Sequence, residues 1–272
     1  GLILLFLPLI LITGTVAVVY YKQEDIVQKL LTTVNEEFQG KITLESSHIA
    51  PFANFPYISI DLKGVKLYET KEQHKTPILT IQDIYVGFDL WTLVNGNFDI
   101  KSIKIAEGLV DIVANENGES NIQRAFIPTN PKEEEETESE ELFFALESVY
   151  LNNLEIDKTN ADSTAFEVFI EGANIKIKSK QDRKFFALNT NLKLTTLKHG
   201  DTTFFNNKLF STKTTVDYDK TKQLLNVPQS DLIIGGVQFE FGGTVDFTDN
   251  VNLDLKVFGQ KPDFSLLLAF VP

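Results

Sequence analysis

The chain has 272 residues, 43% of them hydrophobic and 23% charged, a balance typical of a folded protein with room for one large or two modest domains. Its formal net charge of −13 argues against nucleic-acid partners and against binding of anionic lipid headgroups by a polybasic segment, because both need clustered Lys and Arg. The absence of cysteine excludes disulfides, thiolate metal sites and cysteine nucleophiles. Methionine is also absent from the sequence, so we expect it to be a segment of a longer chain.

A long uncharged run opens the chain. Leu2–Tyr21 reads LILLFLPLILITGTVAVVYY, and a helix of about 20 residues spans the roughly 30 Å hydrocarbon core of a bilayer. Two alternatives fit less well. A signal peptide has a shorter apolar core and an A-x-A cleavage site, and a helix that is apolar on every side needs a large protein around it. The sequence therefore predicts a single transmembrane anchor over residues 1–21.

The next residues predict a short amphipathic helix. Asp25–Phe38 reads DIVQKLLTTVNEEF, and Gly40 follows as a helix end. The apolar residues recur at spacings near 3.6: Ile26, Val27, Leu30, Leu31, Val34 and Phe38. This helix would either cap the end of a sheet or lie on the membrane surface.

Alternating polar and apolar residues predict strands from Lys41 onward. The alternation changes phase at Gly64, which suggests a bulge or bend there. Turns are predicted at Asn95-Gly96 and Asn117-Gly118. Residues 22–127 are assigned to the amphipathic helix and this first β segment. Its apolar positions include Ile58, Ile60, Leu62, Ile84, Val86, Phe88, Leu90, Ile103 and Ile105.

An acidic stretch divides the β region. Residues 128–141, PTNPKEEEETESEE, contain two prolines and no apolar side chain, so we predict a solvated, flexible loop. Residues 142–272 form the second β segment, in which Gly235-Gly236 and Gly242-Gly243 read as bends of a curved sheet. Such alternating strands make a sheet with one wet and one apolar face. The final KPDFSLLLAFVP predicts a short helix, with the chain continuing beyond it.

Catalytic motifs are missing from the sequence. His48, His74 and His199 are far apart, and none belongs to a metal-spaced pair, so each is interpreted as a surface or turn residue. The sequence has no G-x-S-x-G, H-E-x-x-H or P-loop motif. We therefore predict no catalytic residue, no metal site and no cofactor, and we do not expect an enzyme.

Several stretches resemble the AsmA-like family. PYISIDLKGVKL and then TPILTIQDIYVGFDLWTLVNGNFDIKSIKIAEGLVDIVANENGESNIQ are similar to the anchored N-terminal part of these proteins, including a G-x-x-N turn at Gly118–Asn121. VQFEFGGTVDF and the final KPDFSLLLAFVP resemble the continuation found in Bacteroidetes-type members. One departure is Glu107-Gly108, where the family often has a proline. It leaves the fold assignment unchanged.

This resemblance implies a mostly β fold. An N-terminal transmembrane helix and a short amphipathic helix would precede a curved, mainly antiparallel sheet that forms an apolar groove. AsmA-like proteins are similar to TamB and to the bridge-like lipid-transfer proteins, so the resemblance implies a single-pass protein of the bacterial inner membrane with its β region in the periplasm. Its partners would be phospholipid, the inner membrane and outer-membrane proteins, and no nucleic acid.

The first functional hypothesis is a groove that binds or conducts phospholipid between inner and outer membrane and supports outer-membrane biogenesis. The candidate lining residues are Ile58, Ile60, Ile84, Val86, Phe88, Ile103, Ile105, Val237, Phe239 and Phe241. The same apolar stripes also fit a closed hydrophobic core. A non-enzymatic scaffold for envelope proteins, acting through β-edge pairing, is the alternative function. A membrane-tethered hydrolase is a third.

Overall fold

The computed structural model describes residues 20–25, 27–29, 31–72, 76–89, 92, 99–129, 146–248 and 251–259. Most of the predicted anchor (2–19), the Asn95-Gly96 turn, His74, residues 130–141 of the acidic loop and the predicted C-terminal helix lie outside these ranges. The corresponding expectations stay predictions. Within the described ranges, no helix is both long and apolar enough to cross a membrane.

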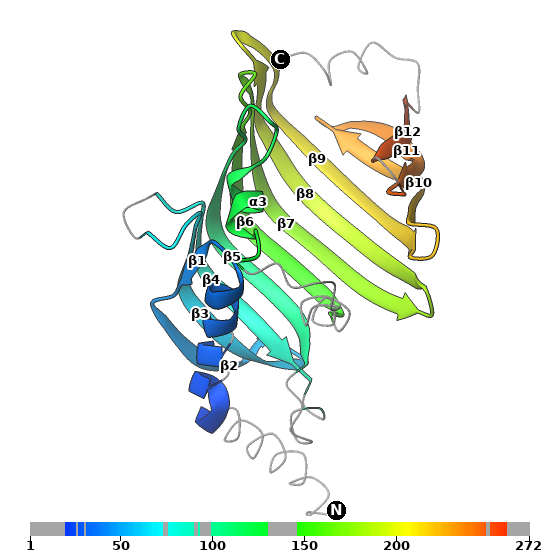
Figure 1. The fold of residues 1–272 in the computed structure, drawn as a ribbon. Coiled ribbons are helices and arrows are strands. Elements are labelled where there is room, and N and C mark those ends of the chain that lie inside the picture. The colour runs from blue at the N-terminus through cyan, green and yellow to red at the C-terminus, as the bar shows by residue number, and fades with distance from the viewer. Residues whose placement is uncertain are drawn as a thin grey trace, which may run out of the picture. The chain divides into compact units, whose positions relative to one another are not determined.

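The prediction of a mostly β chain is confirmed. The described strands form an open 12-stranded sheet in the order β1-β3-β4-β5-β6-β7-β8-β9-β10-β11-β12, with β2 paired to β3 (Figure 1). The strands are β1 (Lys41–Thr43), β2 (Ser46–Asn54), β3 (Tyr57–Tyr68), β4 (Leu79–Phe88), β5 (Ile100–Val113), β6 (Ser148–Thr159), β7 (Thr164–Lys180), β8 (Arg183–His199), β9 (Thr202–Asp219), β10 (Leu224–Ile234), β11 (Val237–Asp246) and β12 (Asn252–Gly259).

The chain divides into two compact units. The first contains Gly1–Leu109 and Glu119–Leu146, and the second contains Val110–Gly118 and Glu147–Pro272. The division between Leu146 and Glu147 follows the acidic stretch that separates the two β segments in the sequence. The structure adds that β5 contributes residues to both units.

The first unit begins with the amphipathic helix. The described residues between 20 and 37 are helical, Val27 is 4% exposed, and Asp25 and Lys29 face solvent, so the prediction of an amphipathic helix there is confirmed. Asn35 in the last turn joins the helix to β1, because its side chain accepts a hydrogen bond from Ile42 N (2.6 Å) and donates one to Ile42 O (2.9 Å).

A second, short helix, α3 (Asn121–Ala125), packs on the strands of the first unit. It follows the predicted turn at Asn117-Gly118, and Ser120 caps it through a capping box with Gln123. Ala125 is buried in a small core with Leu67 and Ile78. Ile42, Leu79 and Ile122 pack against the same core.

Gly40 lies where the chain passes against α3. Gly40 N donates a hydrogen bond to Ala125 O (2.7 Å), and Gln39 N donates one to Ile127 O (3.0 Å). A Cβ atom at position 40 would lie 2.9 Å from the Cβ and the carbonyl oxygen of Ala125 and from the carbonyl oxygen of Tyr68. Any larger residue at position 40 would clash with these atoms, so the close packing requires glycine there.

The second unit is an antiparallel meander in which each strand from β6 to β12 pairs with the next. β7 and β8 have 17 residues and β9 has 18, well beyond the common upper length of about 10 (Figure 1). The β10–β11 connection is a tight turn at Gly235-Gly236, where both residues have positive φ (56° and 84°) that glycine adopts without strain.

We predict that Gly40→Ala destabilises the first unit by about 1–3 kcal/mol, because the added methyl group meets backbone atoms that cannot move independently. Chemical denaturation measures the change. Gly172→Ala is the matched control, since a Cβ there meets nothing within 4 Å, and its effect should stay within about 0.5 kcal/mol. Equal stability of the two variants would contradict the tight packing of Gly40 on α3.

Candidate functional site

The second unit has one mainly apolar face, on which the register also places Lys208, Thr212 and Thr214. Residues directly opposite each other on neighbouring strands point to the same side of a sheet, so the register defines its rows. One row crosses six strands with an apolar residue at every step: Leu154, Ile170, Leu192, Phe210, Ile234 and Val237. A neighbouring row runs through Leu232 and Phe239. These rows are the centre of what we call the apolar face.

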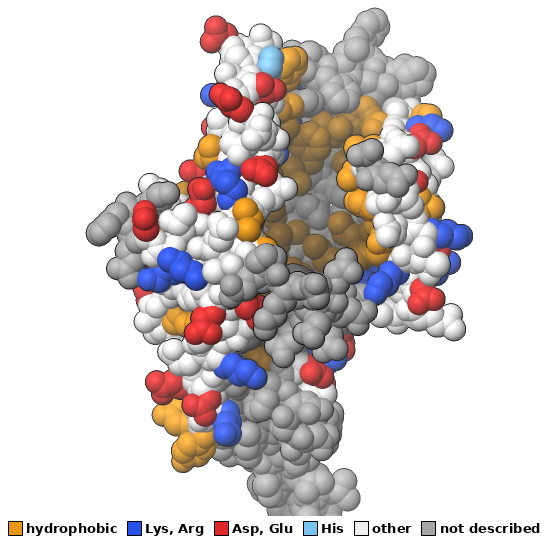
Figure 2. Space-filling view, viewed as in Figure 1, with side chains coloured by type: hydrophobic (Ala, Val, Ile, Leu, Met, Phe, Trp, Pro, Cys, Tyr) orange, Lys and Arg blue, Asp and Glu red, His pale blue; other side chains and the backbone are white. Residues whose placement is uncertain are grey.

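The apolar face extends over every strand from β6 to β12. Figure 2 shows hydrophobic side chains gathered in a hollow over the long strands of this unit. The register places on this face Val149, Leu151, Leu154 and Ile156 of β6; Val168, Ile170, Ile175 and Ile177 of β7; Phe186, Leu188, Leu192 and Leu194 of β8; Phe210 and Val216 of β9; Leu225, Val227, Leu232 and Ile234 of β10; Val237, Phe239, Phe241 and Val245 of β11; and Leu253, Leu255 and Val257 of β12.

Burial varies strongly across this face. Ile234 and Phe239 are each 4% exposed and form a small core against which Phe210, Leu232 and Val237 pack. Most residues of β7 and β8 on this face are half-buried. On β12, Leu253 is 62% exposed and Val257 is 55% exposed. The described residues therefore cover the apolar face only in part.

The opposite face of the same strands carries most of the charged side chains, together with the exposed Leu209, Ile233 and Phe258. Lys176 and Lys178 alternate with Ile175 and Ile177 along β7, and both lysines are exposed. The prediction of one wet and one apolar side is confirmed for this unit.

The ten predicted lining residues fall into two groups. Val237, Phe239 and Phe241 lie on the apolar face of the second unit. The other seven lie in the first unit, where Ile58 pairs with Phe88, Ile60 pairs with Val86, and Ile84 pairs with Leu62. Ile103 and Ile105 lie in β5 and are half-buried.

Both groups contain buried and half-buried residues: Phe239 is 4% exposed in the second unit, and Ile84 is half-buried in the first. Ile60 and Phe88 are each 1% exposed, and Ile58 and Val86 are also buried. The lining residues predicted from sequence include none from β6 to β9, although apolar and polar residues alternate along these strands at Ile175, Ile177, Leu188, Leu192 and Leu194. That alternation was the available signal for the larger part of the apolar face.

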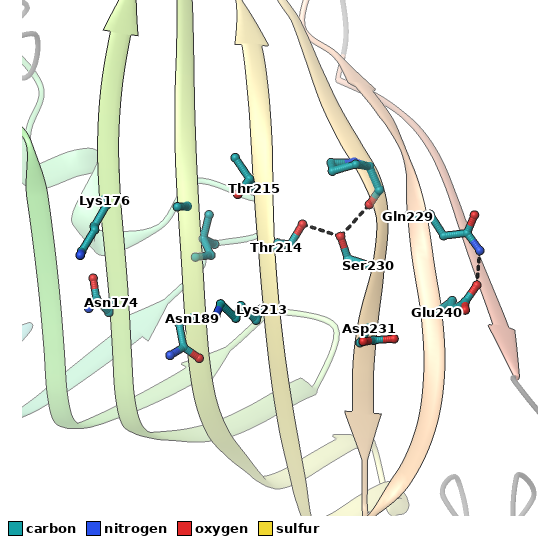
Figure 3. A pocket seen from close by; sticks show the side chains of 13 residues that line it. Asn174, Lys176, Asn189, Lys213, Thr214, Thr215, Gln229, Ser230, Asp231 and Glu240 are labelled. Atoms are coloured by element: carbon teal, nitrogen blue, oxygen red, sulfur yellow. Dashed lines mark hydrogen bonds between the residues drawn. The ribbon is translucent and has the colours of Figure 1, made fainter.

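A hollow of about 970 Å³ lies on the second unit (Figure 3). Its lining comes from β7 to β11 and includes Leu188, Thr214 and Ser230 of the apolar face as well as Asn189, Lys213 and Asp231. Thr214 Oγ1 and Ser230 Oγ are hydrogen-bonded at 2.6 Å, and this contact bridges β9 and β10.

The first unit contains a buried charge cluster centred on Asp61 of β3. The Asp61 side chain is 2% exposed, and its Oδ2 lies 3.1 Å from His48 Nε2 and 3.3 Å from Lys63 Nζ. Lys63 also bonds Asp83, which is the residue paired with it on β4. Among the described residues, no hydrogen-bond partner reaches Asp61 Oδ1 or the buried Ser59 Oγ.

Burial raises the pKa of the Asp61 carboxyl above its ordinary value of 3.8, and the negative charge of Asp83 adds to the rise. The hydrogen bond and charge of Lys63 and the proximity of His48 act in the opposite direction. His48, interpreted from sequence as a surface or turn residue, lies in β2 with its side chain 50% exposed. His199 ends β8, and its Nδ1 lies 2.8 Å from Thr164 Oγ1.

A family model described as TP_0324_N, N-terminal domain, matches residues 21–196. These are 176 of the 272 residues, well over half of the chain. No curated protein matches the sequence.

We predict that Asp61 makes the stability of the first unit fall as pH rises. The folded state keeps the Asp61 proton at pH values where the unfolded state, near 3.8, has lost it, so folding takes up a proton in that window. The stabilising effect is complete below pH 3.8 and is lost as pH rises through the raised pKa of the folded state. Asp61→Asn removes this dependence, so the melting temperature of the variant minus that of the wild type should increase across the window.

Thermal melts followed by circular dichroism from pH 3.5 to 8 provide the measurement. Asp254→Asn, at an exposed carboxylate of β12, is the comparison variant for the loss of one negative charge. If the melting temperature of Asp61→Asn minus that of the wild type decreases with rising pH, the pKa of Asp61 is not raised by folding and the prediction is wrong.

Proposed function

The chain belongs to the family of the TP_0324_N N-terminal domain, and we propose that it binds and conducts phospholipid along its apolar face. The observation that supports this function is the continuity of the apolar face from β6 to β12. A row of six apolar residues on six neighbouring strands leaves no polar group to interrupt an acyl chain that crosses it.

The hydrophobic effect provides the driving force. Removing a Leu, Ile or Phe side chain from water contributes roughly 1.5–3 kcal/mol, so an apolar face of more than twenty residues does not stay in contact with water. The half-buried residues of β7 and β8 and the exposed residues of β12 need a cover. Two acyl chains of about 16 carbons, at roughly 0.8 kcal/mol per buried CH₂, bind favourably to such a surface.

The proposed setting is a bacterial envelope. The uncharged run Leu2–Tyr21 would anchor the chain in the inner membrane, with the β region in the periplasm. The resemblance to AsmA-like proteins supports this setting and a role in outer-membrane biogenesis. In this mechanism the apolar side chains solvate acyl chains passively, while lipid headgroups remain at the open side of the face.

Photo-crosslinking with matched positions tests the proposal. Val257 and Phe258 are neighbours on β12 and are both 55% exposed, but Val257 lies on the apolar face and Phe258 pairs with Glu240 on the polar face. We predict that p-benzoylphenylalanine at position 257, and not at position 258, gives phospholipid adducts in cell membranes. Mass spectrometry identifies the adducts and measures lipid that co-purifies with the unmodified chain.

Equal lipid labelling at positions 257 and 258, or none at either, would contradict the proposal. These two positions are preferable to Phe88 and Phe239, which are 1% and 4% exposed. A charged or bulky substitution at those buried phenylalanines tests folding before it tests lipid binding.

Exposure of β12 favours one alternative, a scaffold that pairs its edge strand with another envelope protein. β12 pairs only with β11 among the described strands, and all eight of its residues are exposed. The same experiment distinguishes the two functions. Protein adducts at both positions 257 and 258, without lipid, are expected for edge pairing.

A deletion tests the anchor. We predict that removing residues 1–21 yields a chain that fractionates with soluble proteins, because the uncharged run is then gone. Sedimentation of membranes followed by immunoblotting provides the measurement. If the truncated chain still sediments with membranes, the amphipathic helix at 25–38 binds the membrane surface and the single-anchor hypothesis is wrong.

A further inference from the structure

Charge is distributed unequally between the two faces of the second unit. The whole chain has 38 Asp and Glu against 25 Lys and Arg. On β6 to β12, however, every Asp and Glu for which the register gives a partner lies on the face opposite to the apolar face: Glu155, Asp157, Glu167, Asp217, Asp219, Asp231, Glu240, Asp246 and Asp254. The same register places Lys158, Lys184 and Lys208 on the apolar face. The charged groups that the register places on the apolar face are therefore cations.

Lys158 lies near one end of the apolar face. The register of β6 against β7 has no shift from Leu154 to Lys158, so Lys158 follows Leu154 and Ile156 on the same side of β6. Its partner on β7 is Phe166, and Lys158 Nζ lies 5.9 Å from the centre of the Phe166 ring. Both residues are half-buried. The ammonium group is therefore held over an aromatic ring on a mainly apolar surface.

No carboxylate pairs with Lys158 among the described residues, and its recorded contact there is the ring of Phe166. The nearest acidic residues along the strands face the other way. Asp157 pairs with Glu167 on the opposite face, where Glu167 Oε2 accepts a hydrogen bond from Thr196 Oγ1 (3.3 Å). An aromatic ring attracts a cation but carries no full negative charge. A lysine that acyl chains cover needs a counter-charge, because an unpaired ammonium group is costly to remove from water.

We propose that Lys158 binds the phosphate of the phospholipid whose acyl chains lie on the apolar face. This inference rests on the proposed function and adds to it the residue that recognises the headgroup. The phosphate supplies the missing negative charge and accepts a charge-assisted hydrogen bond from the ammonium group.

The position of Lys158 along β6 suits a headgroup. Thr159, the last residue of the strand, is exposed, whereas Leu154 is 5% exposed. A phosphate at Lys158 therefore lies at the border with water, and the acyl chains extend from it over Ile156 and Leu154. A lysine at such a border can also extend its apolar stem along the surface and leave its ammonium group in water. In that case its charge has no influence on which lipid binds.

Competition between two lipids tests the proposal. The full chain in non-ionic detergent is incubated with equal amounts of dioleoylphosphatidic acid and dioleoylglycerol, which differ only in the phosphate group. The chain is then isolated again, and mass spectrometry measures the two lipids bound to it. We expect the wild type to retain the phospholipid over dioleoylglycerol by about threefold or more. In Lys158→Met and Lys158→Gln this ratio should fall to about one while the total amount of bound lipid is kept, and Lys158→Arg should preserve the wild-type ratio.

Lys193→Met is the matched control. Lys193 of β8 is also half-buried and also pairs with a phenylalanine, Phe169, but it lies on the opposite face. The variant removes the same charge from the same unit, and it should keep the wild-type ratio. Melts followed by circular dichroism check that every variant folds.

The outcomes separate this inference from the proposed function. If the wild type and the two neutral variants at position 158 retain the lipids in the same ratio, the assignment of Lys158 is wrong, and lipid binding on the apolar face stands. An equal loss of preference in Lys193→Met also refutes the assignment. If the wild type retains neither lipid, the proposed function fails and this inference fails with it.

Discussion

Everything in the second unit depends on keeping apolar side chains on one side of very long strands. Side chains in a strand alternate with a period of two, so a single change of parity would send every later apolar residue to the wrong face. The chain changes parity in β6, β7 and β10; register shifts accompany the changes in β7 and β10, and a residue with positive φ, Asn153, accompanies the change in β6. Ile170 and Ile175 have opposite parity in β7, yet both lie opposite leucines of β8, Leu192 and Leu188, that share one parity. The shift between Ile170 and Gly172 makes this possible.

The first unit contains a similar change of parity. In β3 the apolar residues also change parity, from Ile58 and Ile60 to Val65 and Leu67. Here the register with β4 is the same at Lys63 and at Val65, and the parity changes at Gly64, which has a positive φ of 60°. α3 packs against Leu67, and the buried Asp61 cluster lies on the side of β3 opposite to Ile60. A strand that is buried on both sides has no free apolar face.

This contrast explains how far the sequence could predict the structure. Alternation predicted a mostly β chain, apolar spacing near 3.6 predicted the amphipathic helix at residues 25–38, and Asn117-Gly118 predicted a turn before α3. Alternation also predicted a bulge or bend at Gly64, where φ is 60°, and it gave no warning of the register shift after Ile170. Register is set by hydrogen bonds between strands, and those partners are distant in the sequence. The same limit applies to the candidate site. Phe88 and Phe239 both alternate with polar neighbours in the sequence, so alternation does not distinguish a residue of the first unit's core from one on the apolar face.

The exposure of the apolar face points to the kind of cover it needs. Its residues pass from 4% exposed at Ile234 and Phe239 to 47–62% exposed at Leu255, Val257 and Leu253 on the edge strand. A globular core becomes polar before it reaches an edge, because an exposed apolar edge strand promotes aggregation. The apolar alternation continues on β12, the last of the described strands, with Asp254 and Lys256 on the other face. A cover that continues past the edge fits this arrangement. Acyl chains can provide it along the face, and a further strand can provide it along the backbone of β12.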